Sequence, residues 1–146
     1  MSNKSKTAAH PTEPTDDQLF DLRQADQASP ITMINLLKFR EIAHYEDESL
    51  GDAAAISGQE AYQKYADVAS AKIHENGGSV IFLAPTQQLV VGDPDKNDWD
   101  MVAIVAYPSR AAYLKGFDSD EYQAAIKHRI AGLERRLLIQ CTKSLV

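Results

Sequence analysis

Four segments of this chain have the composition of β-strands that are apolar on both faces. They span Ile31–Phe39, Val80–Val91, Trp99–Tyr107 and Leu137–Cys141, and none shows the strict polar–apolar alternation of a strand with one face in water. Two predicted helices between them can cover one face of a small sheet. The other face still carries large aliphatic side chains, so it needs a second layer, most simply a second copy of the chain.

The segments between the strands carry helix signals. Gln59–Asn76 repeats apolar residues at helical spacing, and the glycines that follow it are typical of a helix end. A second helical region begins after Ser109, is interrupted at Gly116 and restarts at Asp118. Its predicted apolar stripe is Tyr122, Ile126, Ile130 and Leu133.

Turn residues complete the predicted topology. Pro85 cannot donate a ladder hydrogen bond, so we expect a bulge or bend there and an edge position for the second strand. The polar run Asp93–Asp98 is typical of a turn and predicts a hairpin between the second and third strands. The order β-α-β-β-α-β predicts an α+β, ferredoxin-like fold with an antiparallel sheet.

The predicted organisation has three parts. Residues 1–14 are expected to form a disordered tail, and residues 15–29 a short leading helix capped by Thr15. Residues 30–146 form the globular domain. The long connection Arg40–Gly58 is acidic and contains His44 and Tyr45, which could fold inwards; it is either a functional loop or a surface insertion.

Composition limits the classes of binding partner that we expect. The chain has 146 residues, a net charge of −6 and no run rich in lysine and arginine, which argues against nucleic acid or an anionic membrane surface. No apolar stretch is long enough to span a bilayer, and residues 1–14 lack the apolar core of a secretory signal. The single cysteine, Cys141, cannot form an internal disulfide, so we expect a cytoplasmic protein.

Arg129 is the leading candidate for a site residue, because it falls within the apolar stripe of the last helix. A buried guanidinium needs a partner. The candidates are Asp100, Glu60 or a bound anion, which leaves two interpretations open: a structural ion pair, or an anchor for a ligand's carboxylate or enolate-like oxygen.

Other candidates follow from periodicity. Asn35 and Lys38 lie on opposite faces of the first strand, so at most one of them can line a given pocket. The remaining ligand-binding candidates are the inward-facing tyrosines and a histidine near the edge of the helical stripe: Tyr62, Tyr65, Tyr107 and His128.

The sequence lacks the motifs that several kinds of chemistry require. The four histidines show no metal-ligand spacing, so no metal site is predicted. No glycine-rich phosphate loop or nucleophile elbow occurs, and no cofactor is expected.

A series of short motifs runs along the chain: Asn35–Arg40, Gly58–Tyr65, Gly77-Gly78, Trp99-Asp100, Tyr107–Arg110, Asp120–Tyr122, His128-Arg129 and Leu133. Over about residues 30–141, this series resembles one known family, the domain of unknown function 1330 (DUF1330) in the dimeric α+β barrel superfamily. This resemblance implies a ferredoxin-like protomer that forms a homodimer through its sheet. It implies no activity, although neighbouring families include cofactor-independent monooxygenases, lactone isomerases and binding modules.

Two functions therefore remain open. The first is a small-molecule site in a cleft between helices and sheet, suited to proton transfer or cofactor-independent oxidation or isomerisation. The second is a non-catalytic homodimeric module whose polar residues satisfy one another. The residues leave open whether the protein is an enzyme.

Overall fold

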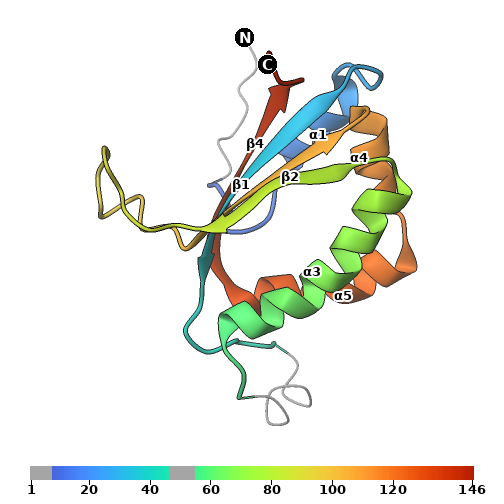
Figure 1. Cartoon of the computed structure of the whole chain (residues 1–146). Helices are drawn as coiled ribbons and strands as arrows, with labels where there is room; N and C mark the ends of the chain where they lie inside the picture. The colour runs from blue at the N-terminus through green and yellow to red at the C-terminus, as the bar shows by residue number, and fades with distance from the viewer. Residues whose placement is uncertain (1–7, 47–54) are drawn as a thin grey trace.

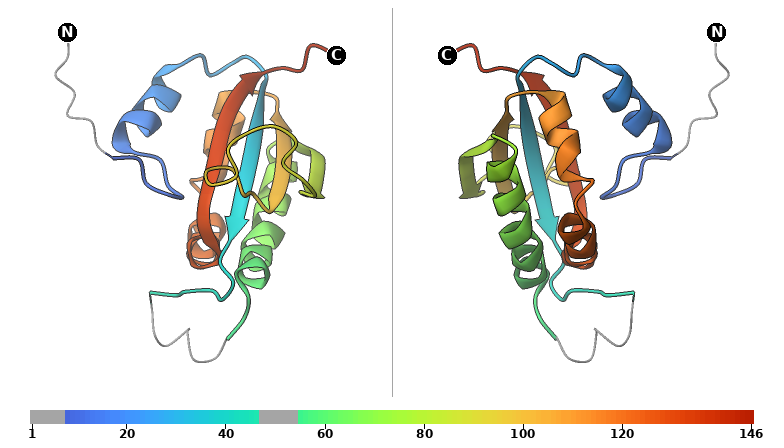
Figure 2. Two further views of the ribbon diagram at one scale, coloured as in Figure 1. Left: turned by 90° about the vertical axis from the view of Figure 1, so that its left-hand side faces the viewer. Right: turned by 90° about the vertical axis from the view of Figure 1, so that its right-hand side faces the viewer.

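The computed structural model describes residues 8–46 and 55–146 and contains one four-stranded antiparallel sheet in the order β2-β3-β1-β4. Its strands are β1 (Ile31–Phe39), β2 (Ser79–Pro85), β3 (Met101–Tyr107) and β4 (Leu133–Thr142). Helices α3 (Gly58–Glu75), α4 (Arg110–Gly116) and α5 (Asp120–Gly132) lie on one side of the sheet, and α1 (Asp16–Gln24) lies beside the β4 edge (Figures 1 and 2). The α+β, ferredoxin-like prediction is confirmed.

The bounds of β2, β3 and β4 differ from the prediction, at positions close to proline or to charged residues. β1 has the predicted bounds and β2 is an edge strand, but β2 stops at Pro85 instead of Val91 and its bulge lies between Val80 and Phe82. β3 begins at Met101, two residues after the predicted start. β4 begins at Leu133, because α5 ends at Gly132 and the chain enters the sheet directly.

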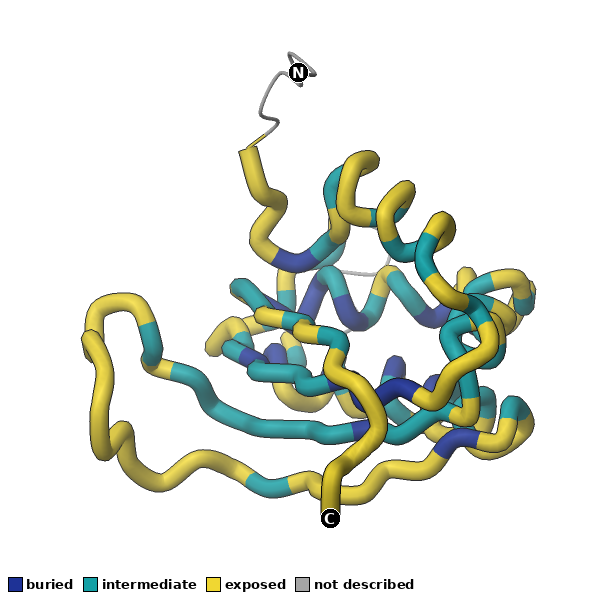
Figure 3. The backbone as a smooth tube through the Cα atoms, turned by 90° about the horizontal axis from the view of Figure 1, so that it is seen from above, coloured by how far each residue is buried: buried dark blue, intermediate teal, exposed yellow. Residues whose placement is uncertain are grey.

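The sheet face that carries no helix is apolar, as the two-sided strands predicted. The register aligns one row across all four strands, Phe82–Ile104–Ile34–Ile139, and a second row, Ala84–Val102–Leu36–Leu137. Phe82 is 51% exposed and Ile139 46% exposed, far more than residues in a core. Figure 2 shows this face with only the 86–100 connection in front of it, and Figure 3 shows that connection mostly exposed, with residues 86–96 all exposed.

Two glycines allow α3 and α5 to cross in contact. Gly58 opens α3 and Gly132 ends α5, and both are buried. A Cβ on Gly132 would lie 2.9 Å from the amide nitrogen of Tyr62 and closer still to the Gly58 carbonyl oxygen. The crossing therefore requires glycine, and it fixes how α3 and α5 approach each other over the sheet.

The N-terminal region packs on the domain. Thr15 caps α1 and forms a reciprocal capping box with Gln18, as its sequence position suggested. Before it, Thr12 is buried, and Arg136 donates from its backbone nitrogen to the Pro11 carbonyl oxygen at 2.9 Å. Residues 8–14 of the expected tail thus include backbone bonded to β4, while residues 1–7 lie outside the described residues.

The long connection after β1 is only partly described. Its residues 47–54 lie outside the described part of the chain, including most of the acidic cluster. On either side, Ile42 and Ser57 form an isolated antiparallel bridge, which closes the base of the connection. In the described ranges, no helix is long and apolar enough to cross a membrane.

Substituting alanine at the helix crossing should destabilise the fold. Gly132→Ala places a methyl group against backbone that cannot rotate away, and we expect the free energy of unfolding to fall by about 3 kcal/mol. Gly116→Ala is the matched control, because the nearest atom to its Cβ is 3.6 Å away, and it should cost nothing or stabilise by up to about 1 kcal/mol. Urea denaturation of both variants checks this, and equal stability would contradict the glycine crossing.

Candidate functional site

Arg129 lies at the centre of a buried polar cluster between the helices. Its side chain is 3% exposed. The Nη1 group donates to the hydroxyl of Tyr122 on α5 at 3.0 Å and to that of Tyr65 on α3 at 3.3 Å. The guanidinium also lies over the Tyr65 ring, 5.1 Å from its centroid. The two hydroxyl oxygens are 2.9 Å apart, so one phenol donates to the other.

One hydroxyl hydrogen of this cluster, the reserve hydrogen, has no acceptor within the cluster. Each phenol has one hydrogen, and Arg129 is a donor only. One hydroxyl hydrogen is used between Tyr65 and Tyr122. The described residues offer no acceptor for the other, and both phenols line a cavity. The second hydrogen is therefore available to a ligand in that cavity.

The carboxylate partner of Arg129 differs from both predicted ones. Nη2 of Arg129 donates to Oε1 of Glu13 at 2.5 Å. Asp100 instead accepts from Lys38 at 3.2 Å and from the backbone nitrogen of Phe39. Glu60 takes part in the N-terminal capping box of α3. The two candidate carboxylates, Asp100 and Glu60, do not pair with Arg129, because each accepts from a backbone amide close to it.

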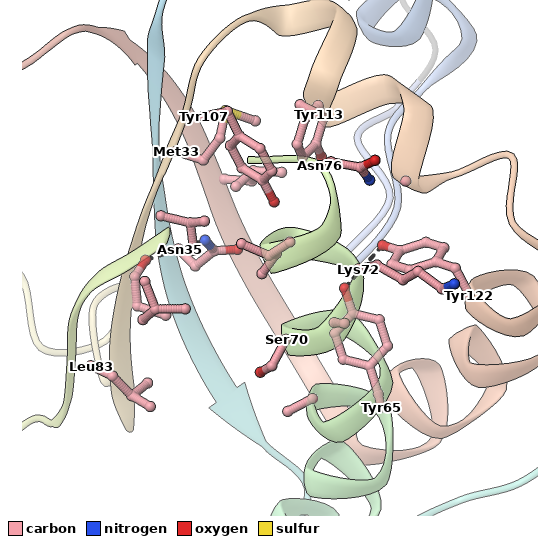
Figure 4. Close-up of a pocket in the computed structure, with 18 of the residues that line it drawn as sticks. Met33, Asn35, Tyr65, Ser70, Lys72, Asn76, Leu83, Tyr107, Tyr113 and Tyr122 are labelled. Carbon is pink, nitrogen blue, oxygen red and sulfur yellow. Dashed lines mark hydrogen bonds between the residues drawn. The ribbon is translucent and has the colours of Figure 1, made fainter. Parts of the chain in front are cut away.

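A first cavity of about 130 Å³ lies between α3 and the helix-facing side of the sheet. Figure 4 shows Asn35 pointing into it from β1, with Tyr65 across from it on α3 and Tyr122 beside Tyr65. Asn35 donates from Nδ2 to the Ala103 carbonyl oxygen at 3.2 Å. No described residue donates to its Oδ1, so the side chain presents an acceptor to the cavity.

A second cavity of about 510 Å³ lies on the other side of the cluster. It is open to solvent in part, and its walls are the N-terminal segment and α1 on one side and α4, α5 and β4 on the other. Arg129 and Glu13 line it, and Arg136 lines both cavities.

The structure gathers most predicted site residues and separates the rest. Asn35, Tyr62, Tyr65 and Tyr107 line the first cavity, whereas Arg129 reaches it through the phenols. His128 lines neither cavity; its Nδ1 is 2.7 Å from the hydroxyl of Tyr45, at the base of the long connection.

Three further residues of the site were missed. Tyr113 of α4 lines both cavities, and Glu13 lies in the supposed tail. Arg136 has a helix-facing side chain because it pairs with Leu37 in the sheet register. Alternation counted back from Leu138, which lines both cavities, would have indicated Arg136 had the fourth strand been predicted to begin before Leu137.

Burial keeps the phenols of this region protonated. Desolvation raises the pKa of Tyr113 to about 12, and it raises the pKa values of Tyr62, Tyr107 and Tyr122 well above the usual range. Desolvation lowers the pKa of His128, and the positive charges of the neighbouring lysines lower it further. This imidazole therefore favours its neutral form. The phenols therefore act as hydrogen-bond donors at neutral pH. Within residues 8–46 and 55–146, no group of three potential ligands is placed to hold a metal ion.

Comparison with known proteins identifies the family. The sequence matches DUF1330, a domain of unknown function, over residues 51–140. The chain belongs to the DUF1330 family. A crystal structure of a protein of unknown function from Rhodopseudomonas palustris is 31% identical, with a TM-score of 0.82, covering 95% of this chain and 100% of that one. No curated protein matches.

More distant structures resemble this DUF1330 protein in fold only. SnoaB, a cofactor-independent oxygenase from Streptomyces nogalater, is 13% identical with a TM-score of 0.45, over 81% of this chain and 98% of that one. A dimeric protein of unknown function with a ferredoxin-like fold from Bacteroides fragilis is also 13% identical, with a TM-score of 0.44, over 81% and 99%. At this distance neither indicates an activity for this chain.

The buried phenols predict a stability that falls at alkaline pH. Because the folded pKa values lie above the unfolded value of about 10, the unfolded chain releases these protons first. The free energy of unfolding should therefore decrease as pH rises above about 10, and the phenolate absorbance of these four tyrosines should appear only as the fold is lost. Alkaline titration with parallel circular dichroism measures both. Full phenolate absorbance near pH 10 in a folded protein would contradict this.

Proposed function

We propose that this protein binds a small organic molecule with a phenolic or anionic oxygen in the first cavity, between α3 and the sheet. The single observation that carries the proposal is the Arg129–Tyr65–Tyr122 cluster at the wall of a largely apolar cavity. Such a cavity, with a few fixed polar groups, is typical of small-ligand sites.

The polar groups of the cavity suit a phenol in particular. Asn35 offers an acceptor on one wall, and the reserve hydroxyl hydrogen of Tyr65 or Tyr122 offers a donor on the other. A phenol can donate to the first and accept from the second. The positive charge of Arg129 behind the two tyrosines would strengthen the donated hydrogen bond and favour negative charge on the ligand oxygen.

The lining favours binding over proton abstraction. Among the described residues that line the first cavity there is no carboxylate and no imidazole. Lys72 lines it, but hydrogen bonding to Glu75 raises the pKa of this amine, which keeps it charged. A cofactor-independent oxidation or isomerisation would therefore act on a substrate that enters already ionised, with the phenols and Arg129 stabilising its oxyanion.

The alternative function, a non-catalytic homodimeric module, draws support from the pairing of Arg129 with Glu13. That ion pair balances the charge of the guanidinium without any ligand. The two functions share one assembly. We propose that a second copy of the chain covers the apolar outer face of the sheet, which carries Phe82, Leu137 and Ile139 in partly exposed positions.

A phenolic probe tests the ligand site. We expect 4-ethylphenol to raise the melting temperature of the native chain, and Asn35→Ala to weaken this binding about tenfold, because a lost hydrogen bond to a half-buried group costs about 1–2 kcal/mol. Calorimetric titration measures the affinity.

Two controls sharpen that experiment. Asn97→Ala removes the same amide from the 86–100 connection and should leave binding unchanged, because Asn97 bonds to the Asp93 carbonyl oxygen outside the cavity. Ethylbenzene lacks the oxygen and should bind more weakly to native protein. Equal effects of both asparagine variants, or no binding at all, would favour the non-catalytic module.

A charge on the outer face tests the dimer. Ile139→Asp puts a carboxylate into the apolar row at its β4 end, and we expect the variant to sediment as a folded monomer while the native chain sediments as a dimer. Phe20→Asp is the control, because Phe20 is a 59% exposed apolar residue on α1, away from the outer face. A monomeric native chain would refute the proposed assembly.

A further inference from the structure

The second cavity presents a charged group that apolar walls surround. Leu19 and Leu22 of α1 face Phe117, Ile126 and Leu138 across it. Arg129 lines the same space, and its Nε atom is buried with no hydrogen-bond partner among the described residues. A charged donor that is not fully paired in an apolar cavity favours an anionic group attached to an apolar body.

Glu13 occupies this position from within the chain, but it satisfies the arginines only in part. Its Oε1 accepts from Arg129, while its Oε2 is buried without a hydrogen bond and lies 3.9 Å from Nη2 of Arg136. Because the Glu13 carboxylate is attached to the backbone through its side chain, its possible orientations are restricted. A carboxylate that is not tethered to a chain can orient freely between Arg129 and Arg136, and it can use both of its oxygens.

The segment that holds Glu13 is attached by a small number of polar contacts. The amides of Thr12 and Glu13 both donate to Nδ1 of His10, at 3.0 and 2.9 Å, which closes a tight turn. Arg136 donates from its backbone to Pro11 and from its Nε to the Thr12 carbonyl oxygen. These hydrogen bonds can be exchanged for water without unfolding the sheet or the helices.

We propose that the Arg129–Arg136 pair is a binding site for small carboxylic acids with an apolar tail, and that Glu13 is a built-in competitor for it. The ligand's carboxylate replaces that of Glu13, and its tail fills the space between α1 and α5. This site shares Arg136 with the lining of the phenol cavity, but its ligand occupies the second cavity, so its failure would leave the proposed function standing.

Hexanoate is a suitable probe, and removal of the competing charge is the decisive change. Glu13→Gln keeps the shape of the side chain but leaves Arg129 without a counter-charge. We expect this variant of the full chain to bind hexanoate at least tenfold more tightly than the native protein in calorimetric titration. Hexanamide, the uncharged analogue, should show no such gain. Equal hexanoate affinity in the two proteins, or binding by neither, would overturn the proposal.

Two further measurements keep the test independent of how well the variant folds. Glu134→Gln removes an exposed carboxylate from β4 and should leave hexanoate affinity at the native value. In the native chain, saturating hexanoate should accelerate hydrogen exchange at the amides of Thr12, Glu13 and Arg136, because these amides bond within or to the displaced segment. Unchanged exchange would place any bound hexanoate elsewhere and refute competition with Glu13.

Discussion

The burial of one guanidinium organises the helical side of this protein. Arg129 lies on the inner face of α5, where an unpaired charge would cost several kcal/mol. Its terminal nitrogens bond to Tyr122 on its own helix, Tyr65 on α3 and Glu13 from the N-terminal segment. Three parts of the chain, distant in sequence, are therefore held at one side chain. The two cavities flank this cluster, and each meets a different edge of it.

The glycine crossing makes that arrangement possible. Contact between the start of α3 and the end of α5 requires Gly58 and Gly132, since any side chain there would meet backbone. With these helices fixed against each other, Tyr65 and Tyr122 project from facing positions and their hydroxyls come within 2.9 Å. A packing constraint at one end of the helix pair thus sets the polar geometry further along it.

The features that local periodicity determines could be predicted, and those that depend on distant pairing could not. A period of two separates Asn35 from Lys38 on β1, and a helical period places Arg129 on the inner face of the last helix; the structure has both. The predicted stripe was wrong in part, because Leu133 belongs to β4 and Ile126 and Ile130 are only half-buried. Glu13 lies 116 residues from Arg129 in a polar segment without periodicity, so no local pattern indicated it. The charged start of β4, Glu134 to Arg136, resembles a helix end, which concealed the inward position of Arg136.

The two faces of the sheet differ in the kind of group that can cover them. The outer face is apolar and offers only area, so a second layer of similar composition can cover it. On the helical side, buried charge and phenols must be satisfied, and more than one group can do so. Glu13 and a ligand carboxylate meet the same demand at Arg129, and they exclude each other. The free energy that holds the N-terminal segment in place therefore reduces the free energy of ligand binding by the same amount. The apparent affinity equals the intrinsic affinity multiplied by the fraction of molecules in which the segment is displaced.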